Sequence, residues 1–403
     1  MTLPLEGYRI IDFTQVWAGP QIGATLGDLG AEVVRVESRS GTDVQRNSPV
    51  EKSPMRQLLE SQWYYRSRSH YITINLLKAP GVELLKRLVQ WSDVLVLNLS
   101  PKTQQALGVD YPSLQSVKPG LIMATFSAAG QDGPWSDLLA FGPAISCIIG
   151  TESLVGYPGD QSQPMLNIWD PDPGMGVMLG FAILTALYHR ERTGQGQLID
   201  LPFTELLPGL LGEAILEYQM TGRVPGPKGN QHPRMAPHEI YPCKDQDTWV
   251  SIAVGAEDEW RAMCDAIGQP GLASDQRFSD PYRRLQHRDE LDAIVSAWTS
   301  QRTHHEATET LRRAGVAASP AFSVADLYHD PHDIERRTSI NIETPELRPE
   351  DVTYGIPWRL SDTPGSIRRL GRPMGADNHR FFSAEFEMSS DEIDRLVQAQ
   401  VIY

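Results

Sequence analysis

The stretch YRIIDFTQVWAGPQIGATLGDLGAEVVRVE, residues 8–37, decides the fold of the N-terminal half of this chain. Its first six residues and its last six residues are each rich in residues that favour strands. Between them, Ala18–Gly19–Pro20 predicts a turn, and residues 21–29 predict a helix that ends near Gly30. A strand, a helix and a second strand in this order form a βαβ unit, which implies a parallel sheet covered by helices.

The same alternation continues along the chain. Further strands are expected at residues 71–76, 94–98, 121–126 and 198–201. Further helices are expected at residues 81–91, 174–192 and 202–220. This pattern predicts an α/β fold built on a Rossmann-like, doubly wound parallel sheet.

A Pro/Gly-rich linker at residues 223–229 predicts a domain boundary. The segment up to residue 330 predicts a smaller α+β domain. Its strands are expected at residues 248–254 and 317–322, and its helices at 257–267, 288–300 and 304–314. The chain then becomes irregular and Pro-rich, and a helix is expected at residues 390–398.

Bulk composition narrows the class of protein. The chain has 403 residues, a net charge of −15 and 40% hydrophobic residues, so it can bury a large core and is not expected to bind nucleic acid or anionic membrane. Its N-terminus lacks the pattern of a signal peptide, and its most apolar segment, residues 177–188, is too short to span a bilayer and predicts a buried helix. Three scattered cysteines, Cys147, Cys243 and Cys264, fit reduced thiols in a cytoplasmic protein.

Several motifs follow one another in a characteristic order. They are LEGYRIIDFTQVWAGP (5–20), DLGAEVVRVE (28–37), NLSP (98–101) with LGVDY (107–111), GQDGP (130–134), DPDPG (170–174) with RERTGQGQ (190–197), and PMG (373–375). Together they resemble the class III CoA-transferases, the family of formyl-CoA transferase and carnitine CoA-transferase. The resemblance covers nearly the whole chain.

The resemblance implies a large Rossmann-like CoA-binding domain made from both chain ends, here residues 1–222 and 331–403. It implies a small domain at residues 223–330, and two chains interlocked like linked rings. The expected assembly is a homodimer, and a heteromer with a sister subunit is the alternative. The expected reaction moves CoA from an acyl-CoA, with succinyl-CoA as our guess, to a free organic acid.

The resemblance assigns Asp170 as the covalent nucleophile. An aspartate has an ordinary pKa of about 3.9, so its carboxylate is ionised near neutral pH and needs no general base to attack a thioester. The sequence alone favours a helix cap for an Asp in this place, and Asp172, directly before Pro173, suits that role equally well. The family match reverses the preference for Asp170 and leaves Asp172 as the cap.

Five other residues complete the expected site. Gln15 follows the first strand, where doubly wound sheets bind ligands, and the resemblance makes it an active-site amide. By the same resemblance Val16 and Ala18 line the CoA entry, and Arg39 lies near the adenine end. Lys102 follows the segment where the family binds phosphate. Without the family, a turn or surface role is favoured for Gln15, Arg39 and Lys102. For Val16 and Ala18 an ordinary turn explains the sequence equally well.

The chain also departs from the family pattern. The cationic run before the third strand is altered to RSRSHY at residues 66–71, and only residues 226–229 (GPKG) offer a faint glycine-rich loop. The aromatic residues 63–65 (WYY) suit packing better than a substrate pocket. His232 and His238 lack a third ligand, so no metal site is expected. No permanently bound cofactor is expected either, because the CoA thioester is a substrate.

Three rival functions remain to be compared with this sequence. An α-methylacyl-CoA racemase needs a His and an Asp about the substrate α-carbon, but Phe141–Gly142–Pro143 stands where that branch has its His. A nicotinamide oxidoreductase fits a strand that ends in Glu37, but the Gly-x-Gly-x-x-Gly turn is absent. A non-catalytic subunit of a heteromeric transferase is disfavoured because Asp170 and Gln15 are both present.

Overall fold

The computed structural model describes residues 2–41, 43, 46, 65–159, 172–341 and 352–403. The chain divides into two compact units. The first comprises residues 1–151, 165–216 and 337–403, and the second comprises residues 152–164 and 217–336. Each unit is described here by itself.

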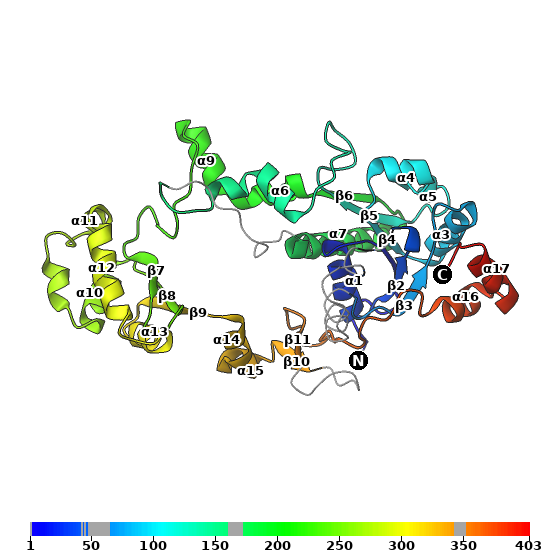
Figure 1. The fold of residues 1–403 in the computed structure, drawn as a ribbon. Helices are drawn as coiled ribbons and strands as arrows, with labels where there is room; N and C mark the ends of the chain where they lie inside the picture. Colours follow the sequence, from blue (N-terminus) through cyan, green and yellow to red (C-terminus); the bar gives the residue numbers. More distant parts are fainter. Residues whose placement is uncertain (1, 42, 44–45, 47–64, 160–171, 342–351) are drawn as a thin grey trace. The chain divides into compact units, whose positions relative to one another are not determined.

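The first unit is built on a six-stranded parallel sheet (Figure 1). Its strands are β1 (Arg9–Phe13), β2 (Glu32–Glu37), β3 (His70–Thr73), β4 (Val94–Leu97), β5 (Ile122–Ser127) and β6 (Leu198–Pro202). They lie in the order β3-β2-β1-β4-β5-β6, so the chain crosses to the other half of the sheet after β3, and the strand order reverses between the neighbours β1 and β4. Ile11 is in register with Val34 on one side and with Leu95 on the other. The carboxyl ends of β1 and β4 therefore diverge into opposite crossovers, which leaves a crevice at this edge.

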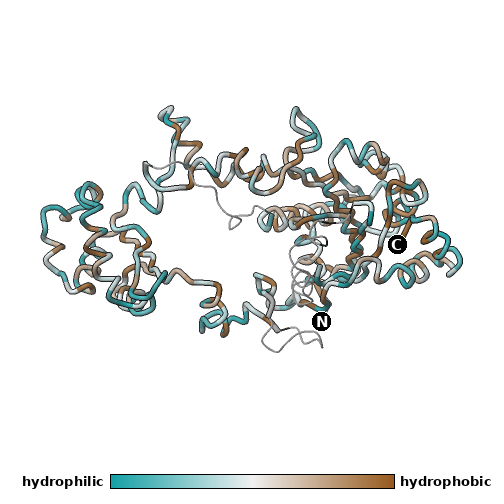
Figure 2. The backbone as a smooth tube through the Cα atoms, viewed as in Figure 1, coloured by the Kyte–Doolittle hydropathy of each residue, from teal (hydrophilic) through white to brown (hydrophobic). Residues whose placement is uncertain are grey.

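Both faces of the sheet are covered, because successive strand residues point to opposite faces. Ile10 and Val33 join one hydrophobic cluster with helices α1 (Ala18–Asp28) and α7 (Asp172–Thr193). Their neighbours Ile11 and Val34 join a second cluster with α3 (Ala79–Trp91), α16 (Asn378–Phe386) and α17 (Ser390–Gln398). The apolar stretches of the tube in Figure 2 lie along these strands and helices. The two ends of the chain thus share one core.

Shorter elements complete the first unit. They are the 3₁₀ turns η1 (Arg39–Gly41) and η3 (Leu207–Leu211), the helices α4 (Pro101–Leu107), α5 (Tyr111–Gln115), α6 (Gly142–Ile149) and α8 (Phe203–Leu206), and the strands β10 (Ser339–Asn341) and β11 (Val352–Tyr354). The 3₁₀ turn η2 (Thr151–Leu154) and the helix α9 (Gly212–Thr221) each contain a boundary between the two units.

The structure corrects two predicted elements of this unit. The expected turn at residues 18–20 is the first turn of α1, because Pro20 there needs no backbone N–H bond. The expected single helix at residues 202–220 is divided into α8, η3 and α9, and Pro208 lies in the tight 3₁₀ segment between the two helices.

The long helix α7 is buried on one side only, whereas the sequence predicts a buried helix. Met175, Leu179 and Ile183 are fully buried in the core. Phe181 and Tyr188, on the other side, are 65% and 62% exposed. None of the described helices is long and apolar enough to cross a membrane.

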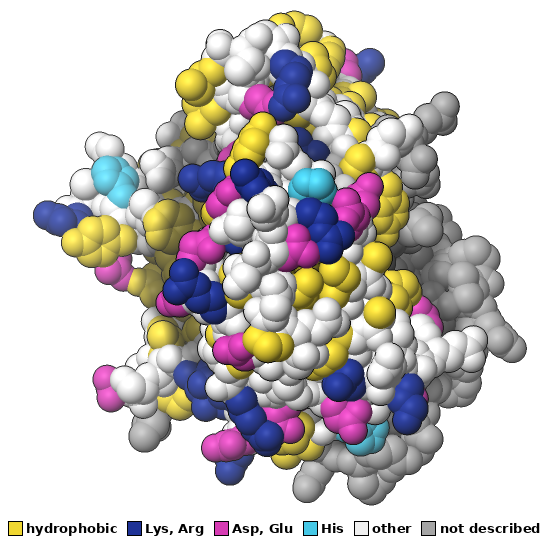
Figure 3. All heavy atoms as spheres, turned by 90° about the vertical axis from the view of Figure 1, so that its left-hand side faces the viewer, with side chains coloured by type: hydrophobic (Ala, Val, Ile, Leu, Met, Phe, Trp, Pro, Cys, Tyr) yellow, Lys and Arg dark blue, Asp and Glu magenta, His cyan; other side chains and the backbone are white. Residues whose placement is uncertain are grey.

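The second unit has its own core around a three-stranded antiparallel sheet in the order β7-β8-β9. Its strands are β7 (His238–Pro242), β8 (Trp249–Ala253) and β9 (Ala317–Ala321). Its helices are α10 (Glu257–Ala266), α11 (Pro281–Gln286), α12 (Arg288–Thr299), α13 (His304–Arg313), α14 (Val324–His329) and α15 (Pro331–Arg336), with a 3₁₀ turn η4 (Pro270–Ser274). On the face drawn in Figure 3, basic side chains are interspersed with acidic ones across the described residues.

Two leucines of the first unit should differ in how much they contribute to stability, because one is buried in the core and the other is exposed. We expect Leu85→Ala to lower the free energy of unfolding by about 3 kcal/mol, because Leu85 is fully buried against the sheet and its loss leaves a cavity. Leu77→Ala is the matched control, since Leu77 is 73% exposed and should change stability by less than about 0.5 kcal/mol. Urea denaturation followed by circular dichroism measures both. Equal effects of the two substitutions would contradict this assignment of the core.

Candidate active site

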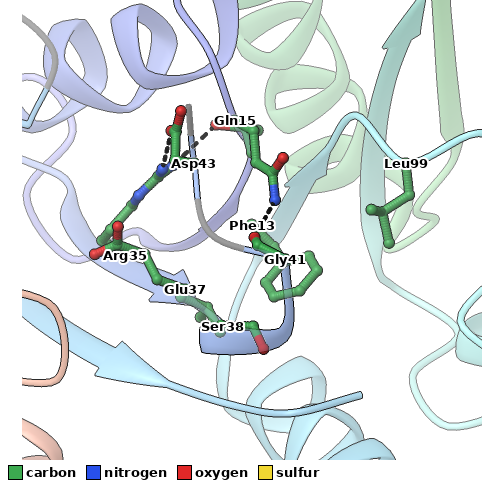
Figure 4. A pocket seen from close by; sticks show the side chains of 10 residues that line it. Phe13, Gln15, Arg35, Glu37, Ser38, Gly41, Asp43 and Leu99 are labelled. Atoms are coloured by element: carbon green, nitrogen blue, oxygen red, sulfur yellow. Dashed lines mark hydrogen bonds and ion pairs between the residues drawn. The ribbon is translucent and has the colours of Figure 1, made fainter. Parts of the chain in front are cut away.

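A small hollow opens at the carboxyl ends of β1, β2 and β4 (Figure 4). This is the edge where the crossovers diverge, so the sheet itself places the hollow where ligands bind in doubly wound folds. Its lining residues are Phe13, Thr14, Gln15, Arg35, Val36, Glu37, Ser38, Gly41, Asp43 and Leu99.

The turn between β1 and α1 is held in a strained conformation. Val16 has φ 72°, which is unfavourable for a β-branched residue. Its backbone N–H donates to Asp43 Oδ1 at 3.1 Å. The neighbouring Gln15 backbone is held in both directions by Asn98, which accepts from the Gln15 N–H at 3.0 Å and donates to the Gln15 carbonyl at 3.1 Å. These contacts fix the direction in which the Gln15 side chain leaves the turn.

The Gln15 side chain lies in the hollow and reaches the turn η1. Its Nε2 donates a hydrogen bond to the Gly41 carbonyl at 2.7 Å, as Figure 4 shows. An amide nitrogen carries two N–H groups, so one further donor remains for a ligand. A neutral donor held in this way can stabilise a developing oxyanion.

A buried network of charges supports this turn from beneath. Arg35 Nη1 donates to Asp12 Oδ1, and Arg35 Nη2 donates to Asp43 Oδ2, each at 3.0 Å. Arg68 Nη2 donates to Asp12 Oδ2 at 2.9 Å, and all four side chains are at least 97% buried. The aspartate that holds Val16 is therefore itself held by an arginine from β2.

The ionisation of this network follows from its pairing. Burial alone would raise the pKa of Asp12, but the charges of Arg35 and Arg68 outweigh it and lower the pKa below its ordinary value of 3.8. Burial would also lower the pKa of Arg35, and Asp12 outweighs this effect and raises it. Asp12 and Arg35 are therefore both charged at neutral pH.

The altered segment at residues 66–71 contributes to the interior instead of a cationic surface. Arg66 Nη2 pairs with Asp28 Oδ2 at 3.1 Å, and both side chains are buried. Arg68 belongs to the network under the Gln15 turn. Tyr65 is buried as well, with Arg46 stacked over its ring at 4.2 Å. Trp63 and Tyr64 lie outside the described residues.

Glu37 is fully engaged at the end of β2. Arg46 Nε and Nη2 donate to its two carboxylate oxygens, each at 2.8 Å. Dinucleotide-binding folds use an acid in this place to bind a ribose hydroxyl. The pairing with Arg46 therefore disfavours the nicotinamide alternative.

The structure brings some of the expected site residues together. Gln15 and Val16 share the strained turn, and Ala18 begins α1 and is buried. Arg39 is exposed in η1, whose Gly41 accepts the Gln15 hydrogen bond. Lys102 is exposed in the first turn of α4, whose N-cap is Ser100. Neither Arg39 nor Lys102 lines the described hollow.

Asp170 lies outside the described residues, which resume at Asp172 with the start of α7. The first turns of α7 pack against the start of α1. A Cβ added to Gly176 would lie 3.4 Å from the Ala18 carbonyl oxygen and 3.3 Å from Gln21 Cγ. The chain segment that carries Asp170 therefore enters a helix that packs beside the β1–α1 turn.

Residues outside the sequence-based site proved important. Asp12, Arg35, Asp43 and Asn98 hold the Gln15 turn. None is predicted from the sequence as a site residue, although Asp12, Arg35 and Asn98 lie in the quoted motifs. Charged residues within apolar strand runs, such as Asp12 in RIIDF and Arg35 in EVVRVE, are the signal that could have identified two of them. His232 and His238 have ring centroids 5.2 Å apart, and no group of three possible metal ligands occurs among the described residues.

Comparison with known proteins identifies the class. A family model described as CoA-transferase family III matches residues 5–378. The chain belongs to this family, and it is a class III CoA-transferase.

Several relatives are similar to this chain over more than nine-tenths of their length. The chain is 32% identical over 400 residues to the succinyl-CoA–D-citramalate CoA-transferase of Chloroflexus aurantiacus, covering 99% of this chain and 98% of the relative. It is 32% and 31% identical to the alpha and beta subunits of a succinyl-CoA–L-malate CoA-transferase from the same species, covering 99% and 100% of this chain and 93% and 98% of the relatives. A crystal structure of a CAIB/BAIF family protein from Brucella suis matches with a TM-score of 0.85 at 28% identity, over 95% of this chain and 99% of that one.

The buried network predicts a specific dependence of stability on pH. Because the pKa of Asp12 is lower in the folded state, its contribution is present above the ordinary value of 3.8 and is lost as pH falls through the folded pKa. We expect Asp12→Asn to lower the free energy of unfolding at pH 7 by about 3–5 kcal/mol, since it leaves two buried arginines undercompensated.

Thermal melts of both proteins at pH 7, 5, 3 and 2 measure this difference in stability, which should narrow only below pH 3.8. Asp275→Asn is the control, because Asp275 pairs with Arg277 at 2.7 Å on the exposed surface, and the substitution should change the melting temperature little. A gap between wild type and Asp12→Asn that stays constant down to pH 2 would contradict the assignment.

Proposed function

We propose that this enzyme moves CoA from succinyl-CoA to a free organic acid, with Asp170 as the covalent nucleophile and Gln15 as the oxyanion donor. The observation that carries the proposal is the Gln15 amide, held in the hollow by the strained turn beside the first turns of α7. The names of the relatives support succinyl-CoA as the donor. They name different acceptor acids, so the acceptor is proposed only as a carboxylic acid.

The proposed chemistry uses one carboxylate twice. The Asp170 carboxylate attacks the thioester carbonyl, which gives a mixed anhydride and CoA thiolate. The thiolate then attacks the aspartyl carbonyl of the anhydride, which gives aspartyl-CoA and releases succinate. The acceptor carboxylate repeats the two steps in reverse, so that CoA leaves on the acceptor and Asp170 is restored. Gln15 Nε2 would donate to the oxyanion of each tetrahedral intermediate.

The CoA-binding residues are proposed from their places around this site. Val16 lies in the strained turn, where its backbone is proposed to contact CoA. Ala18 is the first residue of α1, and the N-terminal end of a helix favours negatively charged ligands. Arg39 and Lys102 provide exposed positive charge on η1 and α4, the segments that follow β2 and β4. The order of the six strands supports a Rossmann-like description of the sheet.

The rivals are disfavoured on specific grounds. Phe141 and Pro143 flank the start of α6, and this segment offers no histidine for racemisation. The family match and the named relatives are transferases. A chain that depends on a sister subunit for activity stays the alternative, because two of the relatives are subunits of one enzyme.

We expect Asp170→Asn to lower the rate of CoA transfer at least about 1,000-fold, because an amide cannot form the anhydride. Asp172→Asn is the matched control two residues away, and it should keep activity within about tenfold. The assay uses succinyl-CoA with a panel of acids, and the sister-subunit alternative predicts no transfer by the purified chain alone.

Trapping gives the second readout. Wild type incubated with acyl-CoA and then with hydroxylamine or borohydride should carry one modification, which tandem mass spectrometry of the peptide assigns to Asp170. A modification elsewhere in the chain, or normal turnover of Asp170→Asn, would refute the nucleophile.

A dimer is proposed from the exposed side of α7. Val177, Phe181, Leu184 and Tyr188 recur at helical spacing, and all are exposed in the single chain. A continuous apolar stripe on a long helix marks an interaction surface. A second copy of the chain is the proposed occupant, interlocked with the first as the family resemblance implies.

The stripe predicts a change in assembly. We expect Phe181→Glu to shift the purified protein from dimer to monomer or to aggregate, because the charge must be buried at the proposed contact. Size-exclusion chromatography with light scattering measures the mass. Leu77→Glu, which changes an equally exposed leucine of the same unit, should leave the mass unchanged. A dimer that persists in Phe181→Glu would rule out this contact.

The three free cysteines support the proposal that this enzyme works in a reducing compartment, the cytoplasm. Cys147, Cys243 and Cys264 are all free, and only Cys147 is exposed. Burial raises the pKa of Cys243 to about 11 and that of Cys264 to about 12, so both stay protonated and unreactive.

A further inference from the structure

The turn η1, which carries Arg39, is anchored at each of its three residues. Gly41 accepts the hydrogen bond from Gln15 Nε2. Ser40 Oγ donates to Asn75 Oδ1 at 3.2 Å. The Arg39 guanidinium lies over the ring of Tyr403, with its carbon 5.2 Å from the ring centroid. An exposed turn beside the hollow is therefore tied to a residue more than 360 positions later in the chain.

Tyr403 is itself fixed in place by β3 and the residues that follow it. Its backbone N–H donates to Thr73 Oγ1 at 2.8 Å. Its backbone carbonyl accepts from Asn378 Nδ2 at 2.6 Å, and its hydroxyl accepts from Asn75 Nδ2 at 2.9 Å. Asn75 is only 5% exposed and also holds Ser40. One buried amide thus contacts both the Tyr403 hydroxyl and the turn η1, while Thr73 and Asn378 hold the Tyr403 backbone.

The contact between Arg39 and Tyr403 can orient the guanidinium as well as hold its positive charge in place. An arginine over an aromatic face gains cation–π energy, and the ring restricts the plane of the guanidinium. A guanidinium with a fixed plane can bind the oxygens of a phosphate in bidentate geometry. Lys102, in contrast, is an exposed flexible side chain that offers a point charge.

We propose that Tyr403 is a positioning residue that holds Arg39 for the 3′-phosphate of the adenosine end of CoA. This inference rests on the proposed function, because it assumes that Arg39 faces bound CoA. It goes beyond that function in one respect. The contact between Arg39 of η1 and Tyr403 is proposed to let the enzyme distinguish CoA from 3′-dephospho-CoA.

Binding of free CoA and of 3′-dephospho-CoA, measured by isothermal titration calorimetry, tests the proposal without depending on turnover. Tyr403→Leu should weaken CoA binding about fivefold and should change binding of 3′-dephospho-CoA less than about twofold. Tyr403→Phe keeps the ring and should stay within about twofold of wild type for both ligands. In the transfer assay, Tyr403→Leu should raise KM for the acyl-CoA and leave kcat unchanged.

A double-mutant cycle shows whether Tyr403 acts through Arg39. Arg39→Gln should weaken CoA binding, and adding Tyr403→Leu to it should cause no further loss. Arg39 is exposed, so Arg39→Lys remains a folded test if Tyr403→Leu fails to fold. We expect Arg39→Lys to lose most of the discrimination between the two ligands, because lysine keeps the charge and loses the planar group.

The matched control is Phe386→Leu, which removes the ring beneath Arg87, an arginine–aromatic pair at 4.5 Å in the same unit. It should lower stability and leave CoA affinity unchanged. Equal weakening of both ligands by Tyr403→Leu, additive effects in the cycle, or full discrimination by Arg39→Lys would each overturn the proposal. If wild type binds CoA but transfers none, the proposed function fails and the binding test of Tyr403 still stands.

Discussion

The pairing of Arg35 with Asp12 and Asp43 is the interaction on which the site depends. It lies beneath the β1–α1 turn and joins β1, β2 and the segment after η1 through charges that water barely reaches. A buried ion pair is weak as a source of stability, because desolvation offsets most of the attraction. Its value here is geometric. Arg35 donates to Asp43, Asp43 accepts from the backbone N–H of the strained Val16, and the direction of Gln15 follows from that turn.

Helix α7 carries the second constraint. Its first turns approach α1 so closely that Gly176 faces the Ala18 carbonyl, and its buried side fills the core between the sheet and solvent. The same helix begins two residues after Asp170 and presents an apolar stripe along its other side. A shift of α7 would therefore alter core packing, the approach of the Asp170 segment and the proposed contact with a second copy together.

Much of the fold could be predicted from the sequence, because strands β1, β2 and β4 are short apolar runs bounded by turn residues. The strand β7 was not expected, since Glu239 and Pro242 interrupt its apolar pattern and its pairing with β8 supplies the stability. The helix α16 was missed for a similar reason. Phe381 and Phe382 become a helical face only against the distant β3 and α3.

The site was predictable only in part. Gln15 could be predicted as a site residue because it closely follows a strand, and a strand end can be recognised from the local sequence. The contacts of Asp12 with Arg68, and of Arg39 with Tyr403, join residues from different parts of the chain, and no local pattern records them. The sequence places Arg66 and Arg68 in a segment where the family has a cationic site. In the structure they form buried ion pairs with Asp28 and Asp12, so their role is structural.

The discontinuity of the first unit has a consequence for how the chain acquires its structure. Strands β1 to β3 are made early, but Phe381, Phe382 and Ile393, which cover their second face, are made only after the whole second unit. The second unit has its own core and a largely continuous sequence, so it can fold while the first is incomplete. Until the last helices arrive, this face of the parallel sheet is covered only in part, by α3 and the segments after β4, and such long-range closure is slow. We expect nascent chains of this enzyme to engage chaperones through that open face.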